Sequence, residues 1–233
     1  MDRVLAAARL HFAHPAVMLG IPWLIVLASF ALNAVLWGAT PVADSGDAQT
    51  GGLSALYVTV LVVYVQAVTQ LLPFGMGMGL SRRSFYLGTA LAALVQGVGY
   101  GLVLTVLGVV ERATDGFGFG PGARFWQPSP IAVDSPLLQF VVYTVPLLAC
   151  AAVGAALGVL FKRWGPPALY ALAVALVALV IGTLALIGWL DAWQQVGEWF
   201  ADQSKLTFAV GVPLVLTVAA GALSFAGLRR VVP

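Results

Sequence analysis

Few side chains in this 233-residue chain could carry out acid–base, nucleophilic or metal chemistry. His11 and His14 stand three residues apart, a spacing at which two imidazoles of one helix can share a metal ion. No third ligand lies near them in the sequence, which therefore favours two imidazoles that face solvent or lipid headgroups. The single cysteine, Cys150, excludes an intramolecular disulfide and a metal site built on thiolates.

Motifs for nucleotide binding and hydrolysis are also missing from the sequence. There is no glycine-rich phosphate loop ending in Lys-Ser or Lys-Thr, no G-x-S-x-G and no H-E-x-x-H. We therefore expect no catalytic, metal-binding or cofactor-binding residue in this chain, and we do not expect it to be an enzyme.

The most prominent charged motif is the short polar elbow Ser81-Arg82-Arg83-Ser84, which separates two apolar runs. So short a connection between two membrane-spanning segments predicts a tight hairpin at a membrane surface. Its two arginines indicate the cytoplasmic surface, because cytoplasmic loops are enriched in Lys and Arg.

The residues just before the elbow weaken a helix. Pro73 removes one helical hydrogen bond, and Gly75, Gly77 and Gly79 lower the helix propensity further. We interpret these four residues as a hinge beside the elbow. The alternative is a kink with no moving part.

Neutral polar side chains occur inside the apolar runs. Thr59, Gln66 and Gln70 lie roughly along one helical face of the second run, and Gln96 and Tyr100 share a face of the third. Polar groups in lipid seek hydrogen-bond partners on neighbouring helices. The pattern fits a weakly polar pathway or a subunit interface, and it fits equally well hydrogen bonds that join helices within one subunit.

Composition assigns the chain to the membrane. Hydrophobic residues make up 61% and charged residues 9% of the sequence, against about 25% charged residues in soluble domains. We predict an all-α membrane protein, a single transmembrane domain over residues 1–233, with six helices of the ~20 residues needed to cross a bilayer. The predicted spans are Ala16–Trp37, Leu53–Leu80, Phe85–Val110, Pro136–Phe161, Pro167–Leu190 and Leu206–Leu228.

No Asp, Glu, Lys, Arg or His lies deep inside any predicted span, which disfavours ion-coupled transport. The fifth span is almost entirely Ala, Leu, Val and Ile, which suits contact with lipid or with an apolar partner.

Three segments outside the spans have a pattern of their own. Residues 1–14 predict an amphipathic helix on the cytoplasmic leaflet, the alternative being a frayed tail, and residues 191–204 predict a second amphipathic helix on the outer leaflet. The loop 111–134 is rich in Gly and Pro and carries interleaved aromatic residues. Its pattern favours ring anchors at the headgroup level over a lid; the rings are Phe117, Phe119, Phe125 and Trp126.

The basic residues set the predicted orientation. Three of the eleven Lys and Arg residues, Arg112, Arg124 and Lys205, fall on one side of the predicted bundle. The others fall on the opposite side; they are Arg3, Arg9, Arg82, Arg83, Lys162, Arg163, Arg229 and Arg230. Because basic loops stay in the cytoplasm, we predict a multi-pass protein of the plasma membrane, a bacterial inner membrane, with both termini cytoplasmic.

The layout of six spans, an N-terminal surface helix, a short basic elbow and an outer helix resembles the permease subunits of type-2 ABC exporters. The stretch Phe74–Thr89, FGMGMGLSRRSFYLGT, is similar to that family's elbow, where G-x-S-R-R-x-x-F/Y-x-x-G/T is common in small bacterial members. The resemblance implies dimerisation with a second permease copy or paralogue, and a separate ATPase subunit that holds ATP and Mg²⁺. It also implies that the coupling residues toward that subunit are Ser81, Arg82, Arg83 and Ser84, supported by Arg3 and Arg9.

The sequence thus predicts the permease subunit of an ATP-driven ABC exporter for a hydrophobic or amphipathic substrate, with membrane lipids and no nucleic acid among its partners. One alternative is a non-transporting or immunity-type membrane subunit that acts against membrane-active peptides. A polytopic lipid-modifying enzyme fits less well, because no nucleophile–base pair or metal cluster is evident.

Overall fold

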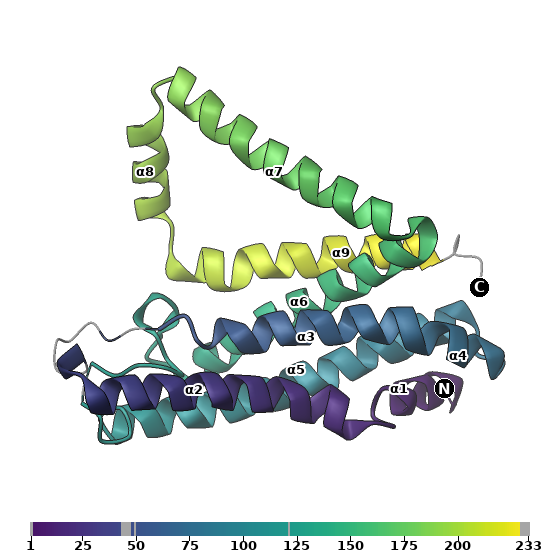
Figure 1. Ribbon diagram of the computed structural model, residues 1–233, viewed down its shortest axis with the longest axis horizontal. Helices are drawn as coiled ribbons and strands as arrows, with labels where there is room; N and C mark the ends of the chain where they lie inside the picture. The colour runs from purple at the N-terminus through teal and green to yellow at the C-terminus, as the bar shows by residue number, and fades with distance from the viewer. Residues whose placement is uncertain (1, 43–47, 49, 121, 229–233) are drawn as a thin grey trace.

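The computed structural model describes residues 2–42, 48, 50–120 and 122–228. Every regular element within these residues is a helix (Figure 1), and six helical segments are long and apolar enough to cross a membrane. They are Ala16–Ala39, Ser54–Gly77, Arg82–Ala113, Pro136–Trp164, Pro166–Trp189 and Thr207–Leu228. The predicted all-α, multi-pass membrane protein is therefore confirmed, and each segment begins and ends within a few residues of its predicted bounds.

Short helices occur at both places where amphipathic patterns predicted them, α1 (Asp2–His11) and α8 (Trp193–Asp202). The longer helices follow the spans. They are α2 (Ile21–Ala39), α3 (Ser54–Gln66), α4 (Leu72–Gly77), α5 (Arg82–Ala113), α6 (Pro136–Trp164), α7 (Pro166–Trp189) and α9 (Val212–Leu228), with a 3₁₀ turn at Ser129–Ile131.

Three of the spans contain the same interruption, a five-residue π turn that ends two residues before a proline. A proline cannot donate to the carbonyl four residues earlier, and its ring crowds that carbonyl. A widened turn relieves the crowding and keeps the span continuous. The turns are η1 (Ala16–Gly20) before Pro22, η3 (Ala67–Leu71) before Pro73 and η5 (Thr207–Gly211) before Pro213.

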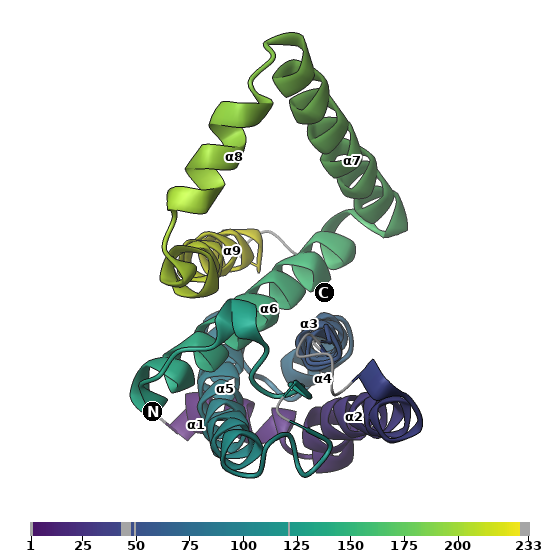
Figure 2. The same ribbon diagram turned by 90° about the vertical axis from the view of Figure 1, so that its left-hand side faces the viewer.

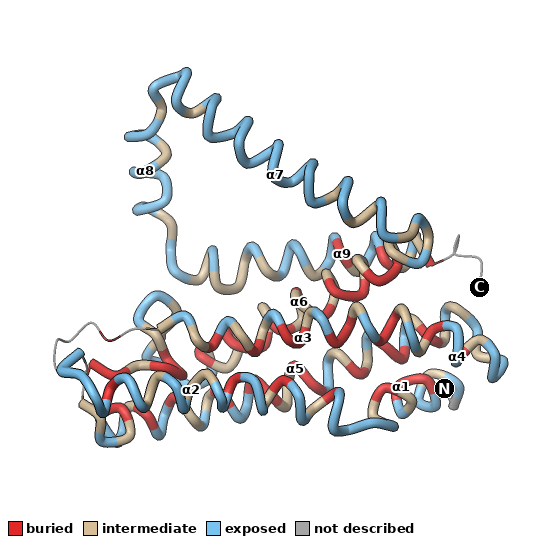
Figure 3. Tube along the Cα trace, in the orientation of Figure 1, coloured by how far each residue is buried: buried red, intermediate tan, exposed pale blue. Residues whose placement is uncertain are grey.

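Helix α6 lies at the centre of the arrangement and packs against α3, α5 and α9 (Figures 1 and 2). Two glycines allow the contact with α3 to be close. A Cβ atom on Gly154 would collide with the Leu61 carbonyl oxygen, and one on Gly158 would lie 2.7 Å from Val68 Cβ. The buried residues gather between these helices and α2, as the red segments of Figure 3 show.

Helix α7 stands apart from this bundle and forms a triangle with α8 and α9 (Figures 1 and 2). None of its residues, all of which the structure describes, is buried. The helix is therefore apolar on every side, and its contacts with the bundle, mainly with α6, bury none of its residues.

One end of the molecule, here called the basic end, collects the start of α1, the α4–α5 turn and the ends of α6 and α9 (Figure 1). Its described cations are Arg3, Arg9, Arg82, Arg83, Lys162 and Arg163, while Arg229 and Arg230 lie outside the described residues. Arg112, Arg124 and Lys205 lie toward the opposite end, so the fold separates the charges as the sequence predicted.

The opposite end is closed by the loop 114–135, here called the plug loop. Phe125 and Trp126 are 0% and 1% exposed, and their rings lie 5.2 and 5.4 Å from the Phe30 ring of α2. Trp126 also reaches Trp23, at 6.4 Å. The prediction of headgroup anchors is wrong for Phe125 and Trp126, because the loop folds back between the helices.

Glu111, near the end of α5, makes this burial possible. Its carboxylate accepts hydrogen bonds from the backbone N–H groups of Phe125 and Gln127, both at 2.8 Å, and of Trp126 at 3.0 Å. The Tyr143 hydroxyl donates to the Trp126 carbonyl at 2.6 Å. The buried loop backbone therefore finds its partners inside the protein, as a segment without access to water requires.

We predict that Glu111→Gln destabilises the protein by roughly 2–4 kcal/mol. The side-chain NH2 group of glutamine would face backbone N–H groups, which are also donors and therefore lose an acceptor. Thermal unfolding in detergent measures the loss, and proteolysis within the plug loop should become faster. Glu198→Gln on the exposed face of α8 is the matched control and should change neither quantity. Equal behaviour of the two variants contradicts this role of Glu111.

Candidate functional site

The candidate site is the surface at the basic end where α1 meets α5. Ala7 and Ala8 of α1 are 0% and 6% exposed, and they lie directly over Gly88 of α5. A Cβ atom on Gly88 would lie 2.5 Å from Ala7 Cβ and 2.8 Å from the Ala8 nitrogen. The two helices are thus in near backbone contact, which only a glycine at position 88 permits.

His11, at the end of α1, points into the bundle. Its Nε2 lies 2.9 Å from Thr89 Oγ1, and its ring centroid lies 5.7 Å from that of Phe85. The Thr89 hydroxyl donates to the Phe85 carbonyl, so it accepts the Nε2–H of His11. The other ring nitrogen, Nδ1, is buried without a hydrogen-bond partner among the described residues.

The expected solvated imidazole is wrong for His11, which is 3% exposed, whereas His14 is exposed as expected. The buried face of α1 runs through Ala7, Ala8 and His11, and Leu5 is 44% exposed. Burial lowers the pKa of His11 to about 4, so the ring is neutral near pH 7. In the described parts of the chain, no three His, Cys, Asp or Glu side chains gather where they could hold a metal ion.

The arginine pair belongs to the first turn of α5, which begins at Arg82, rather than to a connecting loop. Ser81 caps the helix: its Oγ accepts the Ser84 N–H at 3.1 Å and donates to Ser84 Oγ at 2.9 Å. The polar residues of the predicted elbow therefore fix where α5 starts.

The turn itself lies at residues 78–81 and ends α4 with a Schellman motif. Gly79 has φ +81°, and the Leu80 N–H donates to the Gly75 carbonyl at 3.0 Å. Of the four predicted hinge residues, Gly79 is thus required by the turn, and Gly75 packs closely against Leu80, Phe85 and Leu10. Gly77 has open space around it, and Pro73 follows the π turn η3.

The basic side chains of this region lie on its surface. Arg3, Arg9 and Arg83 are exposed and Arg82 is half-buried. The structure brings these four cations to one end of the molecule, on the two elements that the resemblance implicated.

The five polar residues considered for a pathway do not meet at one place. Gln96 Nε2 donates to the Met18 carbonyl at 2.7 Å, and the Tyr100 hydroxyl donates to the Leu19 carbonyl at 3.1 Å. Pro22 leaves the Met18 carbonyl without its helical donor, so Gln96 replaces a bond that the proline removed. These two side chains join α5 to the first span within one subunit.

The remaining three residues lie elsewhere. Thr59 is buried, and its hydroxyl donates to the Ala55 carbonyl of its own helix at 2.6 Å. Gln66 and Gln70 are exposed and line a small cavity of about 100 Å³ with His11 and His14.

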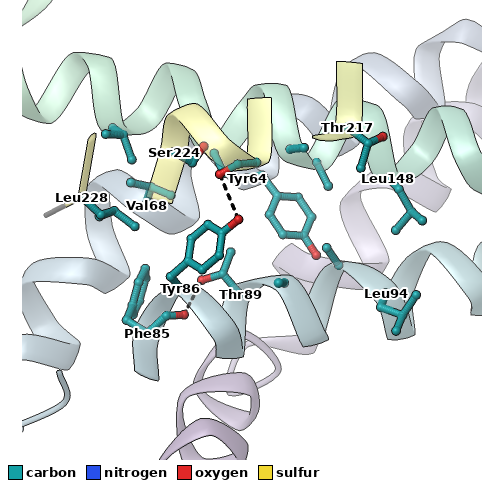
Figure 4. A pocket seen from close by; sticks show the side chains of 17 residues that line it. Tyr64, Val68, Phe85, Tyr86, Thr89, Leu94, Leu148, Thr217, Ser224 and Leu228 are labelled. Atoms are coloured by element: carbon teal, nitrogen blue, oxygen red, sulfur yellow. Dashed lines mark hydrogen bonds between the residues drawn. The ribbon is translucent and has the colours of Figure 1, made fainter. Parts of the chain in front are cut away.

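Sequence reasoning missed a larger cavity, of about 310 Å³, between α3, α5, α6 and α9 (Figure 4). Its walls are mostly Ala, Leu and Val, with the hydroxyls of Tyr64, Thr89 and Ser224 among them. These three residues come from three different spans. No local pattern connects them to one another, because only the packing of the spans brings them together.

We predict that Gly88→Ala destabilises the protein by about 1–3 kcal/mol and releases α1 from α5, because the added methyl group overpacks a backbone contact. Gly99→Ala is the matched control on the same helix, because no atom of another described element lies within 4 Å of its added Cβ. It should be neutral or stabilise the helix by about 1 kcal/mol. Thermal unfolding measures both variants, and destabilisation of equal size by both contradicts the contact.

We also predict that acid releases α1. The pKa of His11 is lowered from 6.5 to about 4 by burial, so the undocked state binds more protons between these values. The stability of the docked helix is complete above about pH 6.5 and falls by up to about 3 kcal/mol as the pH approaches 4.

The accessibility of the thiol in an Ala7→Cys variant without Cys150 reports this release. It is measured as the labelling rate divided by that of a small free thiol at the same pH, because the thiolate fraction itself falls in acid. This ratio should rise in acid, and His11→Gln should remove its pH dependence while His14→Gln retains it. A ratio that is independent of pH in the parent variant contradicts the prediction.

No protein-family model matches this chain, and no match was found among curated proteins or among solved structures.

Proposed function

We propose that this chain is the permease subunit of an ATP-driven ABC exporter of the type-2 class, which moves a hydrophobic or amphipathic compound and relies on a separate subunit for ATP hydrolysis. The observation that carries the proposal is the packing of α1 on the start of α5. Through Gly88 and His11 these two elements are joined into one surface that presents exposed arginines. A motor subunit docked on this surface acts on the membrane helices directly.

Helix α5 provides the connection from this surface to the rest of the bundle. It is continuous over 32 residues, about 48 Å at 1.5 Å per residue. Its far end holds Glu111 and with it the plug loop. A displacement of the first turn is therefore transmitted along one helix to the closure at the opposite end.

The hinge belongs to the same proposal. The second span is interrupted by η3 before Pro73, whereas α5 is uninterrupted. When α5 moves, the second span yields at η3, because a π turn next to a proline has fewer regular hydrogen bonds than an α-helix. Gly79 keeps the connection between the two spans short.

Helix α7 supports the part of the proposal that concerns a second permease copy or paralogue. A helix that is apolar on all sides and has no buried residue in its own chain can cover its surface only with lipid or another subunit. Small residues recur on α7 at alternating intervals of four and three, a spacing that allows helices to approach closely. They are Ala171, Ala175, Ala178, Gly182 and Ala185.

In this proposal the basic end faces the cytoplasm of a cell whose plasma membrane holds the protein, with both termini on that side. The distribution of Lys and Arg supports this orientation. Ser81 and Ser84 fix the start of α5, and Arg82 and Arg83, with Arg3 and Arg9, contact the ATPase.

The plug loop favours a second candidate, a non-transporting subunit of the same class that acts against membrane-active peptides. Phe125 and Trp126 fill the end through which a cargo would leave. Flux of an amphipathic dye from vesicles that hold the intact complex separates the two candidates, because only the exporter moves it.

We predict that Arg82→Glu with Arg83→Glu weakens the association with the ATPase subunit at least about tenfold, since like charges then meet across the contact. Copurification from the native membrane and the ATPase activity of the complex measure the loss. Lys162→Glu with Arg163→Glu is the control, because it makes the same charge change at the same end on α6. Recovery of the wild-type chain without any ATPase, or unchanged ATPase activity in the elbow variant, counts against the proposal.

A further inference from the structure

The cavity of about 310 Å³ has the size and lining of a small-molecule site: mostly apolar walls with a few polar groups (Figure 4). Tyr64 and Ser224 are each 1% exposed, and their hydroxyl oxygens have no hydrogen-bond partner in the described parts of the chain. Both residues line the cavity. Two buried donors without acceptors point to a ligand that brings an oxygen acceptor with it.

The cavity opens on the flank of the bundle. Its rim includes Ala90 and Leu94 of α5, which are exposed, and Thr217 of α9, which is half-buried. Beside this opening the Tyr86 hydroxyl donates to the Gly221 carbonyl at 2.9 Å and ties α5 to α9. All three rim residues belong to spanning helices, so the opening faces hydrocarbon and admits a ligand that is already dissolved in the membrane.

A basic depression of about 270 Å³ adjoins the cavity. It lies between the first turn of α5 and the end of α9, and its lining includes Arg82 and Arg83. Leu228 lines both spaces. Arginine side chains at the rim of an apolar cavity match a molecule with a phosphate group at one end and a hydrocarbon chain at the other.

We propose that this cavity holds an acyl chain of a membrane phospholipid, whose ester carbonyl accepts a hydrogen bond from Ser224 and whose phosphate lies at the arginines. Small residues of α6, among them Ala151 and Ala152, leave room for the chain. The lipid site goes beyond the proposed function and does not require an ATPase partner.

The test uses the full chain alone, reconstituted in phosphatidylglycerol vesicles that contain a phospholipid with a photoreactive group in mid-chain. One probe is ester-linked and a second is ether-linked with the same chain length. The ester probe should label residues around the cavity about fivefold more than the ether probe. A fivefold difference in binding corresponds to the free energy of roughly one neutral hydrogen bond, which the ether lacks because it has no carbonyl. Equal labelling by the two probes in the unmodified chain overturns the proposal.

Two variants locate the site. Ala90→Phe narrows the opening and should lower the labelling at least about fivefold, whereas Val95→Phe, on the exposed face of the same helix and outside the lining, should leave it unchanged. The double variant Tyr64→Phe with Ser224→Ala should reduce ester labelling to the ether level. Labelling that is equal in Ala90→Phe and Val95→Phe, or a preference for the ester that persists in the double variant, overturns the proposal.

The stability of the lipid-free protein in detergent distinguishes binding from a structural role. The double variant should unfold at the same or a higher temperature, because the empty cavity gives these hydroxyls no partner to lose. A large loss of stability in this variant contradicts a lipid site. Because no ATPase is present, either outcome leaves the exporter proposal to its own test.

Discussion

Satisfaction of backbone polar groups without water is the constraint on which the rest of the structure depends. Prolines break the helical hydrogen-bond pattern of three spans, and a polar loop enters the bundle. Gln96 supplies the donor that Pro22 withholds from the Met18 carbonyl, and Glu111 accepts three successive amides of the plug loop. Both residues belong to α5, so one helix compensates for irregular backbone beside its middle and at its far end.

The same helix is the continuous part of the bundle, in contrast to three spans that are interrupted. Helix α5 is continuous, is capped by Ser81 and carries α1 on Gly88. The second, first and sixth spans each contain a π turn before a proline. In the proposed exporter, motion imposed on the bundle is absorbed at these turns, while the surface formed by α1 and the start of α5 keeps its shape. The cavity of about 310 Å³ between α5 and α9 lies where continuous and interrupted helices meet.

Hydropathy and charge predicted the spans and the separation of basic residues, because burial in lipid is a property of each segment alone. They failed at residues whose burial depends on a segment that is distant in the sequence. His11 looked like a surface residue, since the glycine that admits α1 lies 77 positions further along the chain. Phe125 and Trp126 resembled interfacial anchors, because nothing local shows that Glu111 provides acceptors for their amides. Tyr64 and Ser224 could not be connected before the packing of α3, α6 and α9 was known. The elbow was found by its charge, yet its first serine, Ser81, turned out to be the N-cap of α5.

Helix α7 has a consequence for how the protein is made. Its eighteen-residue core has a mean hydropathy of 2.7, above that of the other five spans, and none of its described residues is buried. Such a segment leaves the translocation machinery and remains in the bilayer without help from earlier helices. The sixth span depends on α6 for its few buried residues, such as Ala220 and Leu228. During synthesis α7 is therefore the span whose place in the bilayer depends least on packing against other helices.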